Sequence, residues 1–142
     1  QDMLEYYLLP KLLGLAERAW AQQPDWARIN NQTERETALD QSWSIFANTV
    51  GQRDLPRLNY LFGGWNYRIA PPGVVVEKGI LMANNNFPGF EIRYTEDGSE
   101  PTVNATLYKE PVKVNGTIKL KAFDARGRSS RTVTVNAGEL AQ

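Results

Sequence analysis

The sequence predicts an α+β chain in which helices over residues 1–62 precede a small immunoglobulin-like antiparallel β-sandwich over residues 63–142. Three observations support this prediction. Up to residue 62, apolar residues recur at intervals of three and four, which is the period of a helix. Beyond it, short runs of alternating apolar and polar residues are typical of half-buried strands. Turn-forming residues separate these runs, so about seven short strands fit, as in an immunoglobulin-like sandwich.

The first predicted helix carries its apolar residues on one face: Leu12, Leu15, Ala16, Ala19 and Trp20. Pro10 suits the first turn of this helix, where a missing N–H costs nothing. The helix should end before Pro24, because the residue preceding a proline disfavours helical backbone. For residues 3–9 we expect either a separate turn or a helix kinked at the proline.

A second helix is predicted to start at Thr33, where Thr33 and Glu36 fit a capping box. Its apolar face would hold Leu39, Trp43, Phe46 and Val50. Gly51 is the predicted C-cap, because glycine tolerates the left-handed conformation that ends many helices. A short helical piece should follow up to Tyr60, with Asp54 as its cap.

The predicted strands follow from six alternating runs: Trp65–Ile69, Val74–Val76, Phe90–Tyr94, Val112–Val114, Ile118–Ala122 and Val133–Val135. Asn115-Gly116 between two of these runs is the strongest hairpin prediction, because both residue types tolerate positive φ. Neither half is large enough to be an obvious stable unit, so each is expected to lean on another surface.

Composition excludes several classes of function. The 142 residues hold 16 basic and 16 acidic side chains, so the chain has no general electrostatic attraction to nucleic acid or acidic membranes. Without histidine or cysteine it supports no Ser-His-Asp or Cys-His mechanism and lacks the nitrogen and sulfur metal ligands. We therefore expect no metal, no cofactor and no nucleic-acid partner. No stretch is long and apolar enough for a membrane span, and the first residues do not resemble a signal peptide.

Acidic residues near the middle of the sandwich are the first candidate site. Glu96 and Asp97 are adjacent, and neighbours in a strand point to opposite faces, so a paired acid/base role is geometrically poor. Asp97-Gly98-Ser99 is better explained as a turn in which the carboxylate accepts from backbone N–H groups. Calcium binding by Asp97, Ser99 and Glu100 is the alternative, although a calcium shell takes about six to eight oxygens.

Glu17 and Arg18 are the second candidate, beside the apolar stripe of the first helix. We favour a structural ion pair at the edge of a core, and the alternative is a pair that orients active-site groups on a neighbouring surface. Gly63-Gly64 is no phosphate loop, because the Lys and Ser/Thr of that motif are missing.

Tryptophan and tyrosine side chains could stack on sugar rings. Trp20 and Trp43 have helical spacing and are predicted to be core residues. Trp65 and Tyr67 are predicted to pack between the two halves, with a sugar platform as the alternative. Trp26 lies in a polar loop and is the freest of the four tryptophans.

Two stretches resemble a known family. Residues 9–20, LPKLLGLAERAW, are similar to the Pro-Arg-x-x-Ala-x-Ala-Glu-Arg-x-Trp run on the last barrel helix of glycoside hydrolase family 20, with Lys11 in place of the usual Arg. Residues 90–102, FEIRYTEDGSEPT, resemble the Tyr-Thr-x-Asp-Gly-Ser-x-Pro-Thr signature of the chitobiase C-terminal domain. Residues 66–73, NYRIAPPG, look like the link between them.

The resemblance implies that residues 1–62 are the helical end of a β/α barrel, in a bacterial β-N-acetylhexosaminidase that cleaves β-linked glycans. The family mechanism is substrate-assisted and retaining, with one Glu as general acid/base and a neighbouring Asp orienting the acetamido group. The family's Asp-Glu pair and its Trp-x-Glu motif would lie before Gln1. No catalytic, cofactor-binding or metal-binding residue is therefore carried over to this sequence, and we expect the chain alone to be inactive.

The implied partner is the catalytic barrel of the same parent chain, against which the apolar face around Leu15 would pack. Glycan contact and self-association of that face are the further contacts that we consider. The resemblance implies a parent that is secreted, periplasmic or associated with the outer membrane. The alternative function is a carbohydrate-binding or spacer sandwich of another secreted polysaccharide-acting enzyme.

Overall fold

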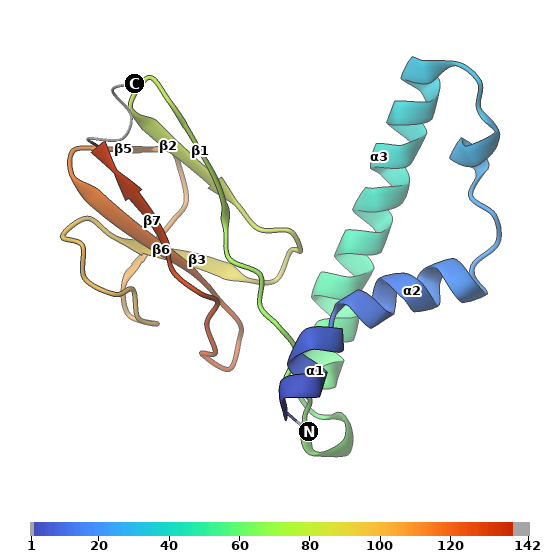
Figure 1. Ribbon diagram of the computed structural model, residues 1–142, viewed down its shortest axis with the longest axis horizontal. Helices are drawn as coiled ribbons and strands as arrows, with labels where there is room; N and C mark the ends of the chain where they lie inside the picture. The colour runs from blue at the N-terminus through green and yellow to red at the C-terminus, as the bar shows by residue number, and fades with distance from the viewer. Residues whose placement is uncertain (1, 138–142) are drawn as a thin grey trace. The chain divides into compact units, whose positions relative to one another are not determined.

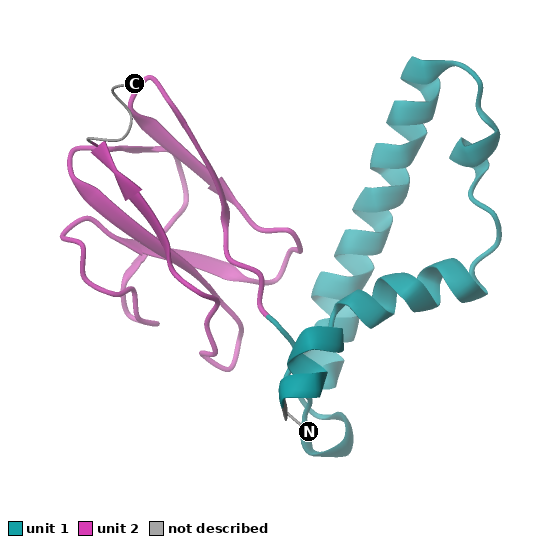
Figure 2. Ribbon diagram, in the orientation of Figure 1, with its two compact units in different colours: residues 1–68 teal, residues 69–142 magenta. Residues whose placement is uncertain are grey.

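The computed structural model describes residues 2–137. The chain divides into two compact units, residues 1–68 and residues 69–142, coloured separately in Figure 2. The first unit is helical and the second is a β-sandwich, so the fold prediction of helices followed by an immunoglobulin-like sandwich is confirmed.

The helical unit is built from short segments around one long helix (Figure 1). Its elements are α1 (Asp2–Leu8), α2 (Lys11–Trp20), the 3₁₀ turn η1 (Asp25–Arg28), α3 (Gln32–Thr49), the π-helical turn η2 (Val50–Asp54), α4 (Leu55–Leu58) and the 3₁₀ turn η3 (Leu61–Gly63). The cis Leu9-Pro10 peptide separates α1 from α2, which ends at Trp20, before Pro24, as predicted.

The start of α3 differs from the prediction. Asn31 is the N-cap, and its side-chain oxygen accepts from the Glu34 N–H at 3.1 Å. The expected capping box is wrong, because Glu36 instead accepts from the Gln32 amide at 2.9 Å. Thr33 lies inside the helix. Asparagine is as good a cap as threonine and stands two residues earlier, so the helix gains additional residues at this end.

The end of α3 also differs, because Gly51 does not terminate the helix. The chain runs on through η2 into α4, and Val50 and Leu55 are each only 1% exposed. Burial of these two side chains on successive turns requires helical backbone between them and overrides the tendency of glycine to end a helix. Asp54 stands at the N-cap position of α4, as predicted, but its carboxylate pairs with Arg53 at 2.8 Å and makes no capping bond.

The sandwich contains seven strands among the described residues. They are β1 (Gly73–Glu77), β2 (Ile80–Asn84), β3 (Glu91–Thr95), β4 (Thr106–Leu107), β5 (Val112–Lys113), β6 (Thr117–Phe123) and β7 (Val133–Asn136). One sheet has the order β1-β2-β5 and the other β4-β3-β6-β7, and every neighbouring pair is antiparallel (Figure 1).

The core of the sandwich receives side chains from both sheets. Its buried members are Leu81, Ile92, Val114, Ile118 and Leu120. Val114 lies just after β5, and each of the other four is flanked by residues that point to the other side of its strand, so the alternation in sequence corresponds to one inner and one outer face per sheet.

Three strand predictions need correction. Residues 65–69 belong to no strand, and two strands, β2 and β4, have no counterpart among the predicted runs. Asn115-Gly116 is not a hairpin turn, because it joins β5 and β6, which lie in different sheets. The tight hairpin is Lys78-Gly79 between β1 and β2, where both residues have positive φ (50° and 76°), as a type I′ turn requires.

Candidate docking surface of the helical unit

The apolar face of α2 is exposed. No residue of α2 is buried, and Leu12, Leu15 and Trp20 are 48%, 65% and 89% exposed. The prediction that Trp20 is a core residue is therefore wrong for this chain. An amphipathic helix folds because its apolar stripe is covered, so an uncovered stripe marks a surface that another protein surface fits.

A second apolar surface lies at the end of α2 nearest α1. Side chains there line a hollow of about 480 Å³: Leu4, Glu5, Leu8, Leu9, Leu12, Leu58, Leu61, Phe62 and Trp65. Eight of these nine are apolar, and Leu4 and Phe62 are 64% and 92% exposed. Such a hollow suits an inserted aliphatic or aromatic side chain rather than a polar ligand.

Backbone hydrogen bonds fix the walls of this hollow. The Trp65 N–H donates to the Leu58 carbonyl at 2.9 Å, and the Arg68 N–H donates to the Leu9 carbonyl at 3.1 Å. The Asn66 N–H donates to the Glu5 carboxylate at 2.9 Å. The segment after η3 is thereby held against α1, although these residues lie about sixty positions apart in the chain.

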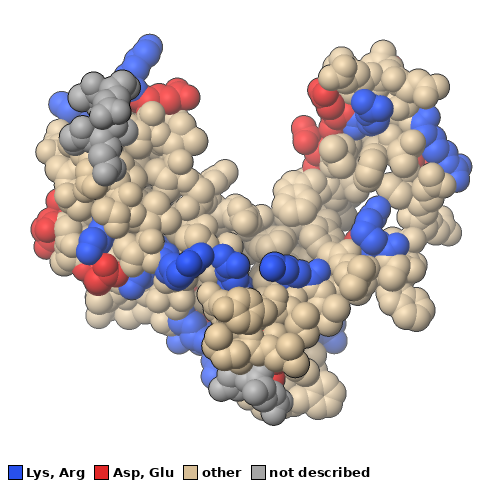
Figure 3. All heavy atoms as spheres, viewed as in Figure 1, with Lys and Arg blue, Asp and Glu red and all other residues tan. Residues whose placement is uncertain are grey.

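Charged groups are sparse over this part of the unit. In the space-filling view, many charged side chains of the helical unit lie near the N-terminal end of α3 and the segment before it, and the surface over α1 is mostly uncharged (Figure 3). Among the described helices, none is both long and apolar enough to cross a bilayer.

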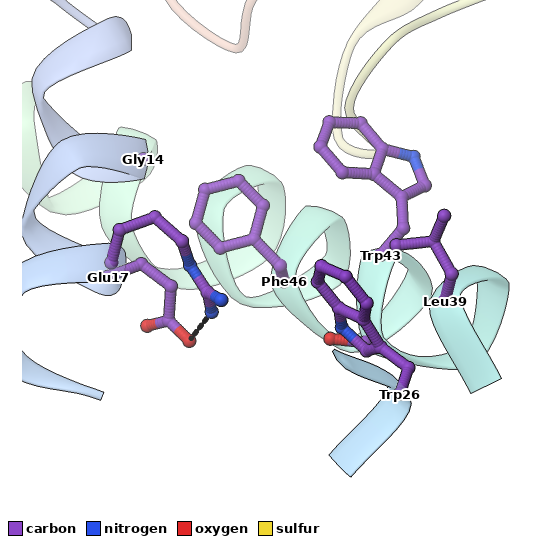
Figure 4. Close-up of a pocket in the computed structure, with 8 residues that line it drawn as sticks. Gly14, Glu17, Trp26, Leu39, Trp43 and Phe46 are labelled. Atoms are coloured by element: carbon purple, nitrogen blue, oxygen red, sulfur yellow. Dashed lines mark ion pairs between the residues drawn. The ribbon is translucent and has the colours of Figure 1, made fainter. Parts of the chain in front are cut away.

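A smaller hollow of about 240 Å³ lies between α2, η1 and α3 (Figure 4). Trp26 from η1 and Trp43 and Phe46 from α3 line it, and the rings of Trp43 and Phe46 are 5.7 Å apart. Trp43 is 51% exposed, so its predicted core role is wrong. Trp26 is half-buried, so Trp20 rather than Trp26 is the most exposed tryptophan of these elements.

Glu17 and Arg18 border the same hollow and form an ion pair at 3.5 Å. Both side chains are about half exposed (46% and 48%), so the pair is solvated and contributes little to stability. Trp65 is half-buried and Tyr67 is 3% exposed. Their packing between the two halves stays a prediction.

The acidic candidates of the sandwich form a turn. The Asp97 carboxylate accepts from the Ser99 N–H at 2.9 Å and from the Ser99 hydroxyl at 2.6 Å, and Gly98 has φ of 75°. The Ser99 hydroxyl, followed by the Ser99 N–H, lowers the pKa of Asp97. Within residues 2–137, no group of three or more His, Cys, Asp or Glu side chains is arranged to hold a metal ion.

Glu100 connects the loop that follows this turn to β6. Its carboxylate accepts from Thr132 at 2.6 Å and pairs with Lys119 at 2.9 Å and Lys121 at 3.0 Å. The hydrogen bond from Thr132, followed by those from the two lysines, lowers the pKa of Glu100 to about 2. This carboxylate therefore has a structural role in the sandwich.

The helical unit thus presents two apolar surfaces, the face of α2 and the hollow beside α1. The family model described as the chitobiase/beta-hexosaminidase C-terminal domain matches residues 54–132. This chain belongs to that family.

Two known proteins align with almost the whole of this chain. The N,N'-diacetylchitobiase of Vibrio harveyi is 31% identical over an alignment of 144 positions, gaps included, that covers 94% of this chain and 16% of that protein. The beta-hexosaminidase of Vibrio vulnificus is 24% identical over an alignment of 151 positions, gaps included, that covers 94% of this chain and 17% of that protein. The chain thus spans about a sixth of the length of these relatives, and the resemblance carried by residues 9–20 and 90–102 is confirmed.

The match to the C-terminal domain family begins inside the helical unit. It starts at Asp54, the last residue of η2, and so includes α4, η3 and four residues of the larger hollow, Leu58, Leu61, Phe62 and Trp65. Sequence reasoning singled out Trp65 but missed Leu58, Leu61 and Phe62, because Phe62-Gly63-Gly64 indicated only a change of pattern. The available signal was an aromatic residue before two glycines. Phe62, Gly63 and Gly64 all have positive φ, and the Phe62 side chain is 92% exposed.

Proposed function

We propose that the chain is the non-catalytic C-terminal portion of a β-N-acetylhexosaminidase, a longer polypeptide that we call the parent. The parent would remove terminal N-acetylhexosamine from β-linked glycans such as chitooligosaccharides. The names and lengths of the two relatives support this proposal, since one is a chitobiase, the other a beta-hexosaminidase, and both are about six times longer than the segment that matches.

The observation that carries the proposal is the uncovered apolar face of α2, with Leu15 65% exposed. A chain with this face and an adjacent apolar hollow needs a large protein surface to cover it. In the proposal, residues 1–62 are the helical end of the catalytic barrel, and the barrel supplies that surface.

The first experiment compares the parent with this chain. Antibody against residues 1–142 captures the parent from the organism that encodes it, and both proteins are assayed with a chromogenic N-acetyl-β-glucosaminide. We expect hydrolysis by the parent and none by the chain alone. Turnover that stays with the purified chain would contradict the non-catalytic role, and a captured parent without activity would contradict the hexosaminidase assignment.

The proposal makes an expectation about each of two further contacts, self-association and glycan binding. The exposed face of α2 should drive self-association when the chain is alone, and sedimentation velocity at several concentrations would detect it. A strict monomer would contradict this expectation. A docking role also predicts that chitooligosaccharides leave the tryptophan fluorescence of the chain unchanged, whereas a saturable change would favour the alternative, a carbohydrate-binding sandwich.

We also propose that the parent works outside the cytoplasm, as a secreted, periplasmic or outer-membrane-associated enzyme. Polymeric β-linked glycans are substrates met outside the cell, which is the reason for this placement. Fractionation of cells followed by blotting with the same antibody tests it, and a purely cytoplasmic signal would contradict it.

A further inference from the structure

The two sheets of the sandwich differ on their outer faces. On the three-stranded sheet, Val74 and Val76 pack against the core, so Val75 between them points outward. Leu81 is a core residue, so Ile80 and Met82 on either side of it also point outward. The outer face of this sheet is therefore partly aliphatic.

These outward residues form one continuous stripe. Val75 lies directly opposite Met82 in the β1–β2 ladder. Ile80 lies two residues before Met82 and therefore on the same side of β2. Val75 is 55% exposed, and Ile80 and Met82 are each 37% exposed. Ile80 is paired across the strands with Glu77 on one side and Lys113 on the other, so one charge of each sign flanks the stripe.

The outer face of the four-stranded sheet is polar, and the chain itself supplies its partners. Glu100 in the loop after β3 binds Lys119 and Lys121 of β6, whose side chains are only 25% and 19% exposed. Arg93 of β3 donates to the Ala105 carbonyl at 2.8 Å and pairs with Glu91 at 2.6 Å. This face already has its contacts, whereas the aliphatic stripe of the other sheet has no comparable cover among its described neighbours.

We infer that the stripe of Val75, Ile80 and Met82 is the surface through which the sandwich packs against the catalytic part of the parent. This inference rests on the proposed function and adds which side of the sandwich docks. The occupant follows from length, since the chain spans about a sixth of its relatives, so most of the surface near the sandwich belongs to the same polypeptide.

The chemistry of the stripe supports this occupant over a glycan. Its side chains are aliphatic, whereas sugar rings are typically bound by flat aromatic faces. The stripe also includes Val75 of the edge strand β1, and an uncovered apolar edge strand invites aggregation unless another element covers it. Contacts between domains of one chain are small, so a stripe of three residues with flanking charges is a fitting centre for one.

The test uses cysteines introduced one at a time into the full parent, at positions within the 142 residues of this chain, which contain none. Val75→Cys reports on the stripe, and Thr134→Cys, an exposed outward residue of β7, is the matched control on the other sheet. Leu15→Cys reports separately on the face of α2. The rate of maleimide labelling is measured for each, with the unsubstituted parent as background and each variant in urea as the fully accessible reference.

We expect Val75→Cys to react about tenfold more slowly than Thr134→Cys, or slower still, because a covered thiol reacts only when the interface opens. Met82→Cys is the second variant on the stripe and should behave in the same way if Val75→Cys impairs folding. Equal rates at the stripe and at Thr134→Cys would overturn the inference.

Leu15→Cys distinguishes a failure of the inference about the stripe from a failure of the proposed function. Slow labelling of Leu15→Cys beside fast labelling of Val75→Cys would leave the proposed function intact and refute only the docking side. Fast labelling of both would refute both. Protection of Val75→Cys that disappears on dilution would identify a second copy as the occupant, and protection that appears only with added chitooligosaccharide would identify a glycan. Either result would overturn the inference.

Discussion

Leu15 gives the sharpest test of docking by the helical unit. It lies on α2 and is 65% exposed in this chain. For Leu15→Ala in the 142-residue chain we expect a change in the free energy of unfolding within about 0.5 kcal/mol, as for other exposed positions. Alanine is also the better helix former, which works against any loss.

In the parent the same substitution should cost much more. Full burial of a leucine side chain contributes about 1.5–3 kcal/mol, and 65% of Leu15 remains to be covered, so docking adds about 1–2 kcal/mol at this position. Truncation then leaves a cavity as well, which moves the cost toward the ~2–5 kcal/mol typical of buried leucines. The expected difference between the two contexts is therefore about 2 kcal/mol.

Urea unfolding followed by far-ultraviolet circular dichroism measures both contexts. Leu120→Ala is the matched control, because Leu120 is 0% exposed within the sandwich core and should cost about 2–5 kcal/mol in the chain and in the parent alike. If Leu15→Ala costs less than about 0.5 kcal/mol in the parent while the control behaves as expected, then Leu15 is exposed there and docking through this face of α2 is wrong.

Three further predictions concern local features. The pKa of Glu100 is lowered from 4.5 to about 2, so its contribution to stability is complete above pH 4.5 and is lost as the pH falls toward 2. Unfolding in urea at a series of pH values should show this loss, and Glu100→Gln should flatten it; an unchanged slope would contradict the network. Asn31→Ala should cost about 1 kcal/mol through loss of the α3 cap, measured by thermal unfolding, with Asn30→Ala, before the cap, as a near-neutral control. Gly79→Ala should cost about 1–2 kcal/mol because its φ is 76°, whereas Gly116→Ala should be nearly neutral because its φ is not positive and nothing lies within 4 Å of an added Cβ. The reverse order would restore Asn115-Gly116 as the tight hairpin.

Periodicity in the sequence was sufficient for the fold class and for most elements. The spacing of apolar residues gave α2 and α3, and the alternation around Ile92, Leu120 and Val135 gave strands β3, β6 and β7. In the strands the pattern is reliable because one face of each strand is covered by the sandwich core, so the identity of each residue reports on its side. In α2 and α3 the three- and four-residue spacing indicates the helix even though much of the apolar face is exposed.

At other positions the sequence offers two competing local signals and does not show which of them prevails. Asn31 and Thr33 are both good caps, and only the helix geometry selects the first. Gly51 is a strong local signal for the end of a helix, yet the burial of Val50 and Leu55 keeps the chain helical beyond it. Asn115-Gly116 is a strong local signal for a hairpin turn, yet it joins β5 and β6, which belong to different sheets.

The candidate surfaces show the same division. An apolar stripe on α2 could be read from Leu12, Leu15 and Trp20, but the sequence predicted a buried core residue at Trp20 where the structure has one that is 89% exposed. Periodicity states which residues share a face, whereas burial depends on what packs on that face. The hollow beside α1 and the aliphatic stripe of the three-stranded sheet required the tertiary structure, because distant segments or paired strands create each of them.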